Sequence, residues 1–376
     1  MGSARRIHVC LTCIELFADS IYGGFGRSTR FIARELANRG LTVSIVVPRR
    51  SATHPDTYRL DGATVHQYDP GRPWHAVAIF KKLGADVYHS QDTSLGTFLA
   101  QVAAPSAAHV VTFRDPMDRV DWRIETDHAN GHRAGWALYR LFINNPLITR
   151  AVRRADALYC AAEFLIPKTV GLFGLQRQPG FLPSPVEMPA DVPKDERPTV
   201  CYVGRWEGRK RVELFFDLAA ECPDVQFIAV GGARDATRDT ALRQRYGGIP
   251  NLHMTGVLDQ FTGSEWSQVL GRSWILVNSS LREGLPTTFV EAAAHRCAIL
   301  SFTDPDGFST RFGHRAPEGG LRDGLRYLLQ DARWKVLGQD GRRYVERVFS
   351  TEAAMDAHVH AYEAVVRTRH DGVRPE

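Results

Sequence analysis

The chain has 376 residues, of which 44% are hydrophobic and 24% are charged, so it is long enough for two or three domains and too apolar for extended disorder. Its formal net charge of +5 suits a phosphate-bearing small ligand or an anionic surface, but is too weak by itself to indicate nucleic-acid binding. The first residues lead straight into an apolar strand, so we expect no secretory leader, and no apolar run is long enough to predict a membrane span. These features predict a cytoplasmic protein.

The first half of the chain alternates β-rich runs with helical periodicity. A strand is expected at residues 7–14, followed by the loop IYGGFGRS and a helix over 30–40 that ends at Gly40. The loop begins like a dinucleotide fingerprint, but Thr29 stands at the third glycine position and no acid follows about 20 residues on, so dehydrogenase chemistry is not expected. Further strands are expected at residues 41–48, 63–68, 85–90, 109–113 and 153–161.

Six cysteines without framework spacing predict reduced thiols rather than disulfides. Cys10 and Cys13 form a C-x-x-C pair within or just after the first apolar strand. No second pair exists in the sequence to complete a zinc site, so burial in the core is favoured over metal or redox use.

Residues 179–198 are dense in proline and lack periodicity, which predicts a linker, and the strand–helix alternation restarts after it. Two rounds of alternation predict an α/β protein with two Rossmann-like, doubly wound domains. We expect domains at 1–182 and 199–350, a proline-rich hinge at 183–198, and a terminal segment, 351–376, whose helix packs back toward the first domain. The second domain is expected to hold a helix over 212–222 and strands at 198–205, 225–232, 251–256, 273–280 and 298–302.

Two loops that follow strands of the second domain carry the charges of a phosphate site. In GRWEGRKR, Arg205 and Lys210 combine a guanidinium fork with an ammonium, which suits a diphosphate. In LREGLPTTFVEAAAHRC, Pro286 fits the first position of a helix whose free amides attract an anion. Glu283 before this turn and Glu291 within the helix offer acceptors for hydroxyl groups. Hydroxyls on both sides of phosphates describe a nucleotide sugar, whereas a solvated surface segment is the alternative for each loop alone.

Four segments together resemble the retaining glycosyltransferases of family 4 (glycosyl transferases group 1), which have the GT-B fold. EGLPTTFVEA resembles their E-x7-E motif, and VGRWEGRKRVELFFDLA resembles their G-R-…-K-G block. NLHMTGVL ahead of SWILVNSS resembles a family strand, and GGFGRSTRFIARELANRG resembles the amino-terminal glycine loop and helix. Each segment is a weak signal alone, but their order and spacing agree over nearly the whole chain.

The resemblance implies that a sugar passes from a nucleoside diphosphate sugar to an acceptor with retention of anomeric configuration, without a metal or other cofactor. Arg205 and Lys210 would neutralise the diphosphate, and Glu283 would contact the transferred sugar. The resemblance further implies donor contacts from Gly23, Gly24, Gly284, Leu285, Pro286, Thr287, Thr288 and Glu291, base contacts from Gly231, His253, Met254 and Thr255, and sugar or acceptor contacts from His89, Arg114 and Asp115.

The chain departs from the family pattern at several places. Arg114 stands where the family has the histidine of a His-Asp pair, which leaves an altered or anionic sugar or acceptor open. Arg296 and Ala298 take the glycine and proline places that follow the E-x7-E motif. The later glycine pair is replaced within residues 303–319, and the Asn-Gly before the hinge is replaced at 183–185. These differences leave the sugar and the acceptor open more than the reaction class.

Three remaining features have ordinary structural explanations beside the functional ones. Asp304 and Asp306 form a D-x-D, but their place in a proline-containing turn favours a turn over a metal site. Residues 136–154 mix aromatics, aliphatics and arginines, which fits either a peripheral membrane surface at the inner face or a core helix with a basic turn. His89 and His253 are more often hydrogen-bonded histidines at strand ends than ligands.

The function expected from the sequence is therefore transfer of a sugar to a saccharide, lipid-linked or small-molecule acceptor. A nucleotide-sugar hydrolase or epimerase on the same fold, or a degenerate nucleotide-sugar-binding module, is the alternative. A phosphorylase of this architecture would carry its cofactor on a lysine, and lysines are few in this chain.

Overall fold

The structure is a computed structural model that describes residues 6–18, 23–50, 54–128, 135, 145–261 and 263–371. The chain divides into two compact units. The first unit consists of Met1–Asp118, Ala137–Pro185 and Thr351–Glu376, and the second of Arg119–Trp136 and Val186–Ser350. Residues 119–128, which we expected within the first domain, therefore belong with the second unit, where buried ion pairs of Asp121 and Glu125 hold them.

The first unit is built on an eight-stranded sheet in the order β3-β4-β2-β1-β5-β6-β7-β8. The β3–β4 pair is antiparallel and the other pairs are parallel. Its central strands are apolar on both faces, as expected of a parallel sheet covered by helices. The strands are β1 (His8–Thr12), β2 (Thr42–Pro48), β3 (Thr57–Leu60), β4 (Ala63–Tyr68), β5 (Val87–Ser90), β6 (Ala108–Phe113), β7 (Ala157–Cys160) and β8 (Gly180–Phe181).

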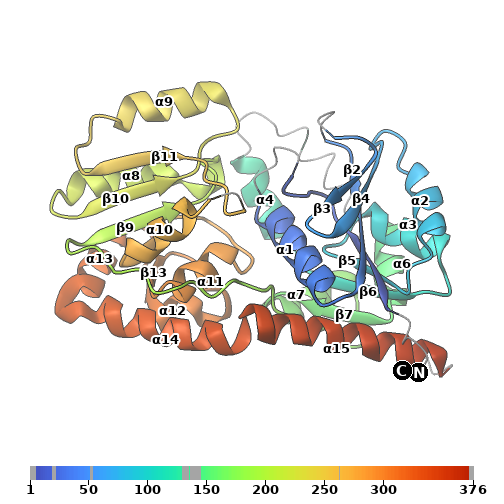
Figure 1. Ribbon diagram of the computed structural model, residues 1–376. Coiled ribbons are helices and arrows are strands. Elements are labelled where there is room, and N and C mark those ends of the chain that lie inside the picture. The colour runs from blue at the N-terminus through green and yellow to red at the C-terminus, as the bar shows by residue number, and fades with distance from the viewer. Residues whose placement is uncertain are drawn as a thin grey trace. The chain divides into compact units, whose positions relative to one another are not determined.

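The last helix of the chain belongs to this first unit. Helix α15 (Thr351–His370) places Met355, Tyr362 and Val365 in the same apolar core as β1 and β2, and runs alongside α1 and β6 (Figure 1). Arg369 near its end pairs with Asp156 at 2.9 Å. The other helices of the unit are α1 (Gly24–Asn38), α2 (His75–Leu83), α3 (Leu95–Ala103), α6 (Pro146–Arg154) and α7 (Leu165–Phe173).

Helix α1 begins earlier than the sequence predicted. Gly24 and the four residues after it are helical, although we expected a loop there. The amide of Gly26 donates to Glu15 Oε1 at 3.1 Å, so a carboxylate from the preceding loop caps the helix start. Gly40, with φ +81°, ends the helix region as expected.

The second unit has a six-stranded parallel sheet in the order β11-β10-β9-β12-β13-β14. Numbered from its own first strand, this is the 3-2-1-4-5-6 order of the Rossmann fold, and the order of the strands reverses between β9 and β12. Ligands of such sheets bind at the carboxyl ends of the strands at this reversal. The strands are β9 (Thr199–Val203), β10 (Gln226–Val230), β11 (Leu252–Gly256), β12 (Ile275–Asn278), β13 (Ala298–Ser301) and β14 (Gly313–Arg315).

The helices of the second unit pack a large aromatic and aliphatic core against this sheet, with Trp206, Phe215 and Phe227 at its centre. Its helices are α4 (Arg119–Asp127), α8 (Val212–Glu221), α9 (Ala236–Tyr246), α10 (Glu265–Arg272), α11 (Thr287–Ala294), α12 (Phe308–Phe312), α13 (Leu321–Leu329) and α14 (Arg333–Val348), with 3-10 turns η1 (Gly208–Lys210), η2 (Pro305–Gly307) and η3 (Gln330–Ala332).

The predicted class, an α/β protein with two Rossmann-like parallel sheets, is confirmed. The strand expected at 153–161 is shorter, because Arg153 and Arg154 end α6. Asp304 lies in the expected turn, where its carboxylate accepts from the amides of Ser309 and Thr310 at 2.8 and 3.0 Å. All six cysteines are free thiols, and burial raises the pKa of Cys10 and Cys13 far above its ordinary value.

Candidate active site

The loop after β9 is held against the neighbouring strand ends by its backbone. The amide of Gly204 donates to Val230 O at 3.1 Å, and the amide of Trp206 donates to Gly232 O at 3.0 Å. The Trp206 side chain is fully buried, so the loop cannot lift away without exposing it. The following turn, η1, presents Arg209 and Lys210 at the point where the sheet reverses.

Lys210 and Glu283, which the sequence places 73 residues apart, meet at this point. The Lys210 ammonium donates to Glu283 Oε1, which also accepts from Asn278 Nδ2 at 3.2 Å. Arg209 Nη1 lies 3.8 Å from the other carboxylate oxygen. The carboxylate is 7% exposed and is thus surrounded by donors at the carboxyl end of β12.

The charges of this cluster shift the pKa values of its members. Burial acts to raise the pKa of Glu283, but the Lys210 and Arg209 cations outweigh it and lower the pKa to about 2. Burial lowers the pKa of Lys210, while the Glu283 carboxylate opposes that effect. Glu283 is therefore an anion at any physiological pH, and it can accept hydrogen bonds from hydroxyl groups but cannot donate a proton.

Arg205 lies at the rim of the same loop. Its guanidinium is 31% exposed and sits 3.6 Å from Glu207, which also lies 3.5 Å from Arg234. Arg205 contributes to lowering the pKa of Lys210, so its charge is felt at the cluster. A half-exposed guanidinium beside a half-buried ammonium can take an anion with little rearrangement.

Helix α11 starts one residue later than predicted. Pro286, expected at the first helical position, is instead the N-cap with extended backbone, and helical geometry begins at Thr287. Among the described residues, no hydrogen bond accounts for the amides of Thr287 and Thr288, as expected for the first turn of a helix. These amides add positive potential at the end of β12, and Glu291 lies half-buried further along the helix.

The residues expected around the base differ in how available they are. Gly231, with φ +133°, could not bear a side chain, because a Cβ would lie 1.9 Å from Gly204 O. His253 is exposed on β11, whereas Met254 packs against the core. The hydroxyl of Thr255 donates to Gly256 O at 2.9 Å. His253 is therefore the side chain of this group that is open to a ligand.

The first unit shows a different use of its polar residues. His89 is fully buried, with its ring nitrogens 2.7 Å from Tyr362 Oη and 2.8 Å from Thr112 Oγ1. Arg114 is also buried and donates to Gln91 and to Ser184 Oγ. Both side chains are thus buried with internal partners, as the sequence favoured for His89, and their contact with the sugar or acceptor stays a prediction.

Two other predicted residues of the first unit remain as candidates. Asp115, directly after the buried Arg114, is half-buried. Gly23 is the N-cap of α1 and Gly24 is its first residue. A Cβ on Gly23 would lie 2.0 Å from Glu15 Oε1, so the close approach that this glycine permits is by Glu15.

Sequence reasoning missed the residues that surround the Lys210–Glu283 pair. Asn278 is the last residue of β12, and Arg209 precedes Lys210. Arg282 immediately precedes Glu283 and is buried against α4. The only local signal was the clustering of basic residues in GRKR, because the acidic partners of Arg282 on α4 are more than 150 positions away from it along the chain.

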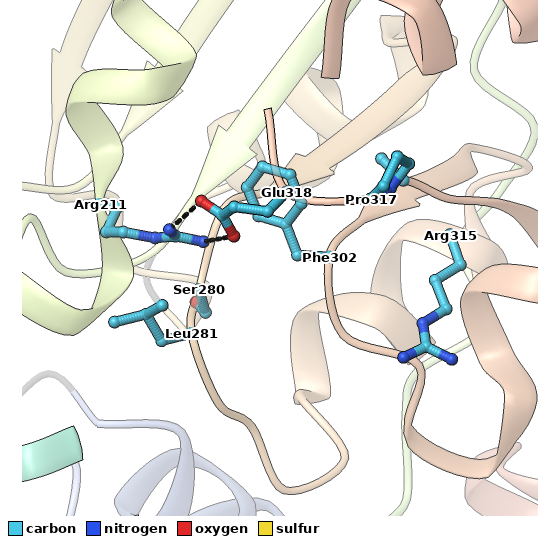
Figure 2. A pocket seen from close by; sticks show the side chains of 8 residues that line it. Arg211, Ser280, Leu281, Phe302, Arg315, Pro317 and Glu318 are labelled. Carbon is cyan, nitrogen blue, oxygen red and sulfur yellow. Dashed lines mark hydrogen bonds and ion pairs between the residues drawn. The ribbon is translucent and has the colours of Figure 1, made fainter. Parts of the chain in front are cut away.

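A cavity of about 480 Å³ adjoins the turn that leads to Glu283. Figure 2 shows Arg211 and Glu318 facing each other in it, joined by two bonds, one of them 3.1 Å long. The Arg211 guanidinium also lies 4.9 Å from the ring centre of Phe302. The cavity is lined by Arg211, Ser280, Leu281, Phe302, Arg315, Ala316, Pro317 and Glu318.

Models of known families match both halves of the chain. A model described as Glycosyltransferase Family 4 matches residues 22–179, and one described as Glycosyl transferases group 1 matches residues 197–331. The chain belongs to this family of glycosyltransferases. No curated protein sequence matches the chain.

Solved structures with the same GT-B architecture cover nearly the whole chain. Sucrose-phosphate synthase from Thermosynechococcus elongatus is 17% identical with a TM-score of 0.75, over 96% of this chain and 100% of that one. Anabaena HepE in complex with UDP and glucose is 12% identical with a TM-score of 0.68, over 96% and 100%. WaaG, a glycosyltransferase involved in lipopolysaccharide biosynthesis, is 16% identical with a TM-score of 0.64, over 95% and 99%. At these identities the likeness shows the fold.

Proposed function

We propose that the chain transfers a sugar from a nucleoside diphosphate sugar to an acceptor hydroxyl, with retention of anomeric configuration. The observation that carries this proposal is the contact of Lys210 with Glu283 at the sheet reversal, beside Arg205 and the start of α11. Lys210, Arg205 and the helix amides would stabilise the charge that develops on the leaving diphosphate. Glu283, ionised and buried, would accept hydrogen bonds from the hydroxyls of the transferred sugar.

Because protein cations stand where the diphosphate would leave, the proposed reaction needs no divalent metal. The donor sugar, the base and the acceptor are open, and the acceptor could be a saccharide, a lipid-linked sugar or a small molecule. HepE has been solved with UDP-glucose, and TarM with α-GlcNAc-glycerol and UDP, which makes UDP the first nucleotide to test. GDP, ADP and TDP complete the panel.

The test measures binding of these nucleotides and transfer from their sugars in a buffer that contains a chelator. Lys210→Ala is expected to weaken nucleotide binding by more than about tenfold and transfer by about a hundredfold or more, since it removes a charge aimed at the leaving group. Arg205→Ala is expected to act in the same direction. Lys335→Ala, on the exposed face of α14, is the matched control and should leave both unchanged.

Three results would contradict parts of this proposal. Wild-type nucleotide affinity in both loop variants would refute the site. Activity that is lost in chelator and restored by manganese would refute the metal-free mechanism. Free sugar or an epimerised donor as the sole product, whatever the acceptor offered, would favour the alternative of a hydrolase or epimerase.

Peripheral association with an anionic membrane surface is part of the proposal for the acceptor side. None of the helices in the described ranges is long and apolar enough to cross a membrane. Residues 136–144 of the candidate segment lie outside the described residues. The rest forms α6, which buries Ile148 and Val152 in the core but exposes Leu147 and Arg150. Sedimentation with anionic vesicles, compared for wild type and Arg150→Ala, tests this surface.

A further inference from the structure

Helix α4 comes from the first half of the sequence but is tied to the loop that carries Glu283. Arg282 is the tie: its Nε donates to Asp121 Oδ1 at 3.0 Å, and its Nη1 donates to Glu125 Oε1 at 2.7 Å. Asp121 and Glu125 are four positions apart, so they lie on the same face of the helix. The Arg282 guanidinium therefore binds carboxylates from two successive turns of α4.

Glu125 also holds the next cation in the network. Arg209 Nε lies 2.7 Å from the same Oε1 of Glu125 that Arg282 contacts. Arg209 Nη1 in turn donates to the carbonyl of Arg282 at 3.0 Å and reaches to 3.8 Å from Glu283 Oε2. The backbones of the two loops are also hydrogen-bonded, because the amide of Leu281 donates to Arg209 O at 3.0 Å. Glu125 is thus the shared partner of both arginines that flank Glu283.

The network is buried and its charges balance. The side chains of Arg282 and Glu125 are each 6% exposed. Buried ion pairs add little net stability over apolar packing, because desolvation of the charges offsets their attraction, but loss of one partner is costly. Such a network therefore fixes geometry more than it stabilises the fold. Its carboxylates are Asp121, Glu125 and Glu283, and its cations are Arg209, Lys210 and Arg282.

We propose that Asp121 and Glu125 of α4 are positioning residues of the transfer reaction, which hold Arg282 and Arg209 so that Glu283 stays on Lys210. The inference rests on the proposed function and adds α4 to the donor site. Without the Glu125 carboxylate, Arg209 and Arg282 lose their common anion, and Arg209 keeps the Glu283 carboxylate at 3.8 Å. Glu283 would then be drawn from Lys210 toward Arg209, which misplaces the group that faces the sugar.

The experiment compares Glu125→Gln and Asp127→Asn in the full chain, with a donor chosen from the nucleotide panel above. Asp127 lies on the same helix but is exposed, so it is a matched control that should keep wild-type kinetics. In Glu125→Gln we expect kcat to fall by about ten- to a hundredfold, as for small displacements of a reacting group, with KM for the donor changed by less than about threefold. A purely structural role would lower the thermal midpoint while folded enzyme kept its kcat.

Arg282→Lys is a second variant that tests the positioning role without removing a charge. A lysine keeps the balance of charge but cannot hold Asp121 and Glu125 at once through a planar fork, so kcat should again fall while the fold is kept. The inference is overturned if folded Glu125→Gln or Arg282→Lys turns over within twofold of wild type, or if KM rises while kcat is unchanged. Failure of the proposed function would look different, because wild type itself would then neither bind nucleotide nor transfer sugar.

Discussion

The carboxyl-terminal edges of the two sheets use charge in opposite ways. In the first unit the buried Arg114 guanidinium donates to Gln91 and Ser184, and burial lowers its pKa while the Asp92 carboxylate opposes that effect. In the second unit Lys210 and Glu283 are held side by side at the sheet reversal, next to the half-exposed Arg205. The comparison teaches that charged residues at a strand end are better candidates for binding where one charge of the cluster, here that of Arg205, reaches the surface.

The largest expected effect comes from removing the anion of the second edge. Glu283→Gln should lower transfer by about a hundredfold or more, since Lys210 and Arg209 lose the carboxylate that orients them. The pKa of Glu283 is about 2, so the loss should be the same from pH 5 to pH 8. Steady-state rates over that pH range check this.

Glu318→Gln is the control for that experiment. Glu318 pairs with Arg211 in the neighbouring cavity and is 65% exposed, so its loss should change transfer by less than about twofold, as for other exposed ion pairs. An equal loss in both variants would place the cavity within the active site and undo the distinction between them.

The first edge is expected to matter for stability and not for donor binding. Arg114→Leu leaves two oxygens of Gln91 and the Ser184 hydroxyl without their donor, at a cost of about 2–4 kcal/mol in the free energy of unfolding. Hydrogen exchange should speed up in the first unit and stay unchanged in the second, and nucleotide affinity should stay within about twofold. A stable variant that had lost transfer would restore Arg114 as an acceptor contact.

The sequence predicted the sheets well because apolar β-rich runs are local signals, and β2 and β9 lie where those runs lie. It also predicted the Lys210 and Glu283 loops, which a motif makes visible. It favoured a hydrogen-bonded His89 but could not predict the partner, because Tyr362 lies 273 positions further along the chain. For the same reason the sequence could not predict that α4 contacts the Glu283 loop, because Asp121 and its partner Arg282 are far apart in the sequence. Long-range pairing decides whether a polar residue faces a ligand or the core.

A smaller expected effect is the pH dependence of the stability of the first unit, which depends on His358. Burial lowers the pKa of His358 in α15 to about 3, and the Arg114 charge adds to that, although the Pro183 carbonyl opposes it. The unfolded chain binds this proton below about pH 6.5, whereas the folded unit does not, so stability is full above that pH and falls as pH drops toward 3. The slope is about 1.4 kcal/mol per pH unit for this group.

His358→Gln should remove that share of the slope, measured by hydrogen exchange in the first unit between pH 6.5 and pH 5. The neighbouring His89, whose ring centre lies 5.9 Å away and whose pKa burial also lowers, keeps its own share. His360→Gln, exposed two positions further along α15, should leave the slope unchanged. An unaltered slope in His358→Gln would mean that the folded unit takes up this proton as readily as the unfolded chain does.

The smallest effect concerns Arg296, which occupies the place of a family glycine after α11. Its φ of +61° is left-handed, which costs a non-glycine residue about 1 kcal/mol. Its guanidinium lies 3.3 Å from Asp191 of the linker, an exposed pair worth less than about 0.5 kcal/mol. A shorter contact also holds the linker nearby, because Lys194 Nζ donates a hydrogen bond to His295 O at 2.7 Å.

Arg296→Gly should therefore stabilise the second unit by a few tenths of a kcal/mol up to about 1 kcal/mol, since the relief of backbone strain exceeds the lost ion pair. Asp191→Asn, which removes the ion pair and leaves the backbone unchanged, should destabilise it slightly, and denaturant unfolding followed in the second unit measures both. Destabilisation by Arg296→Gly would instead assign this arginine to holding the linker. The departure from the family glycine would then be explained by the linker contact and not by tolerance of strain.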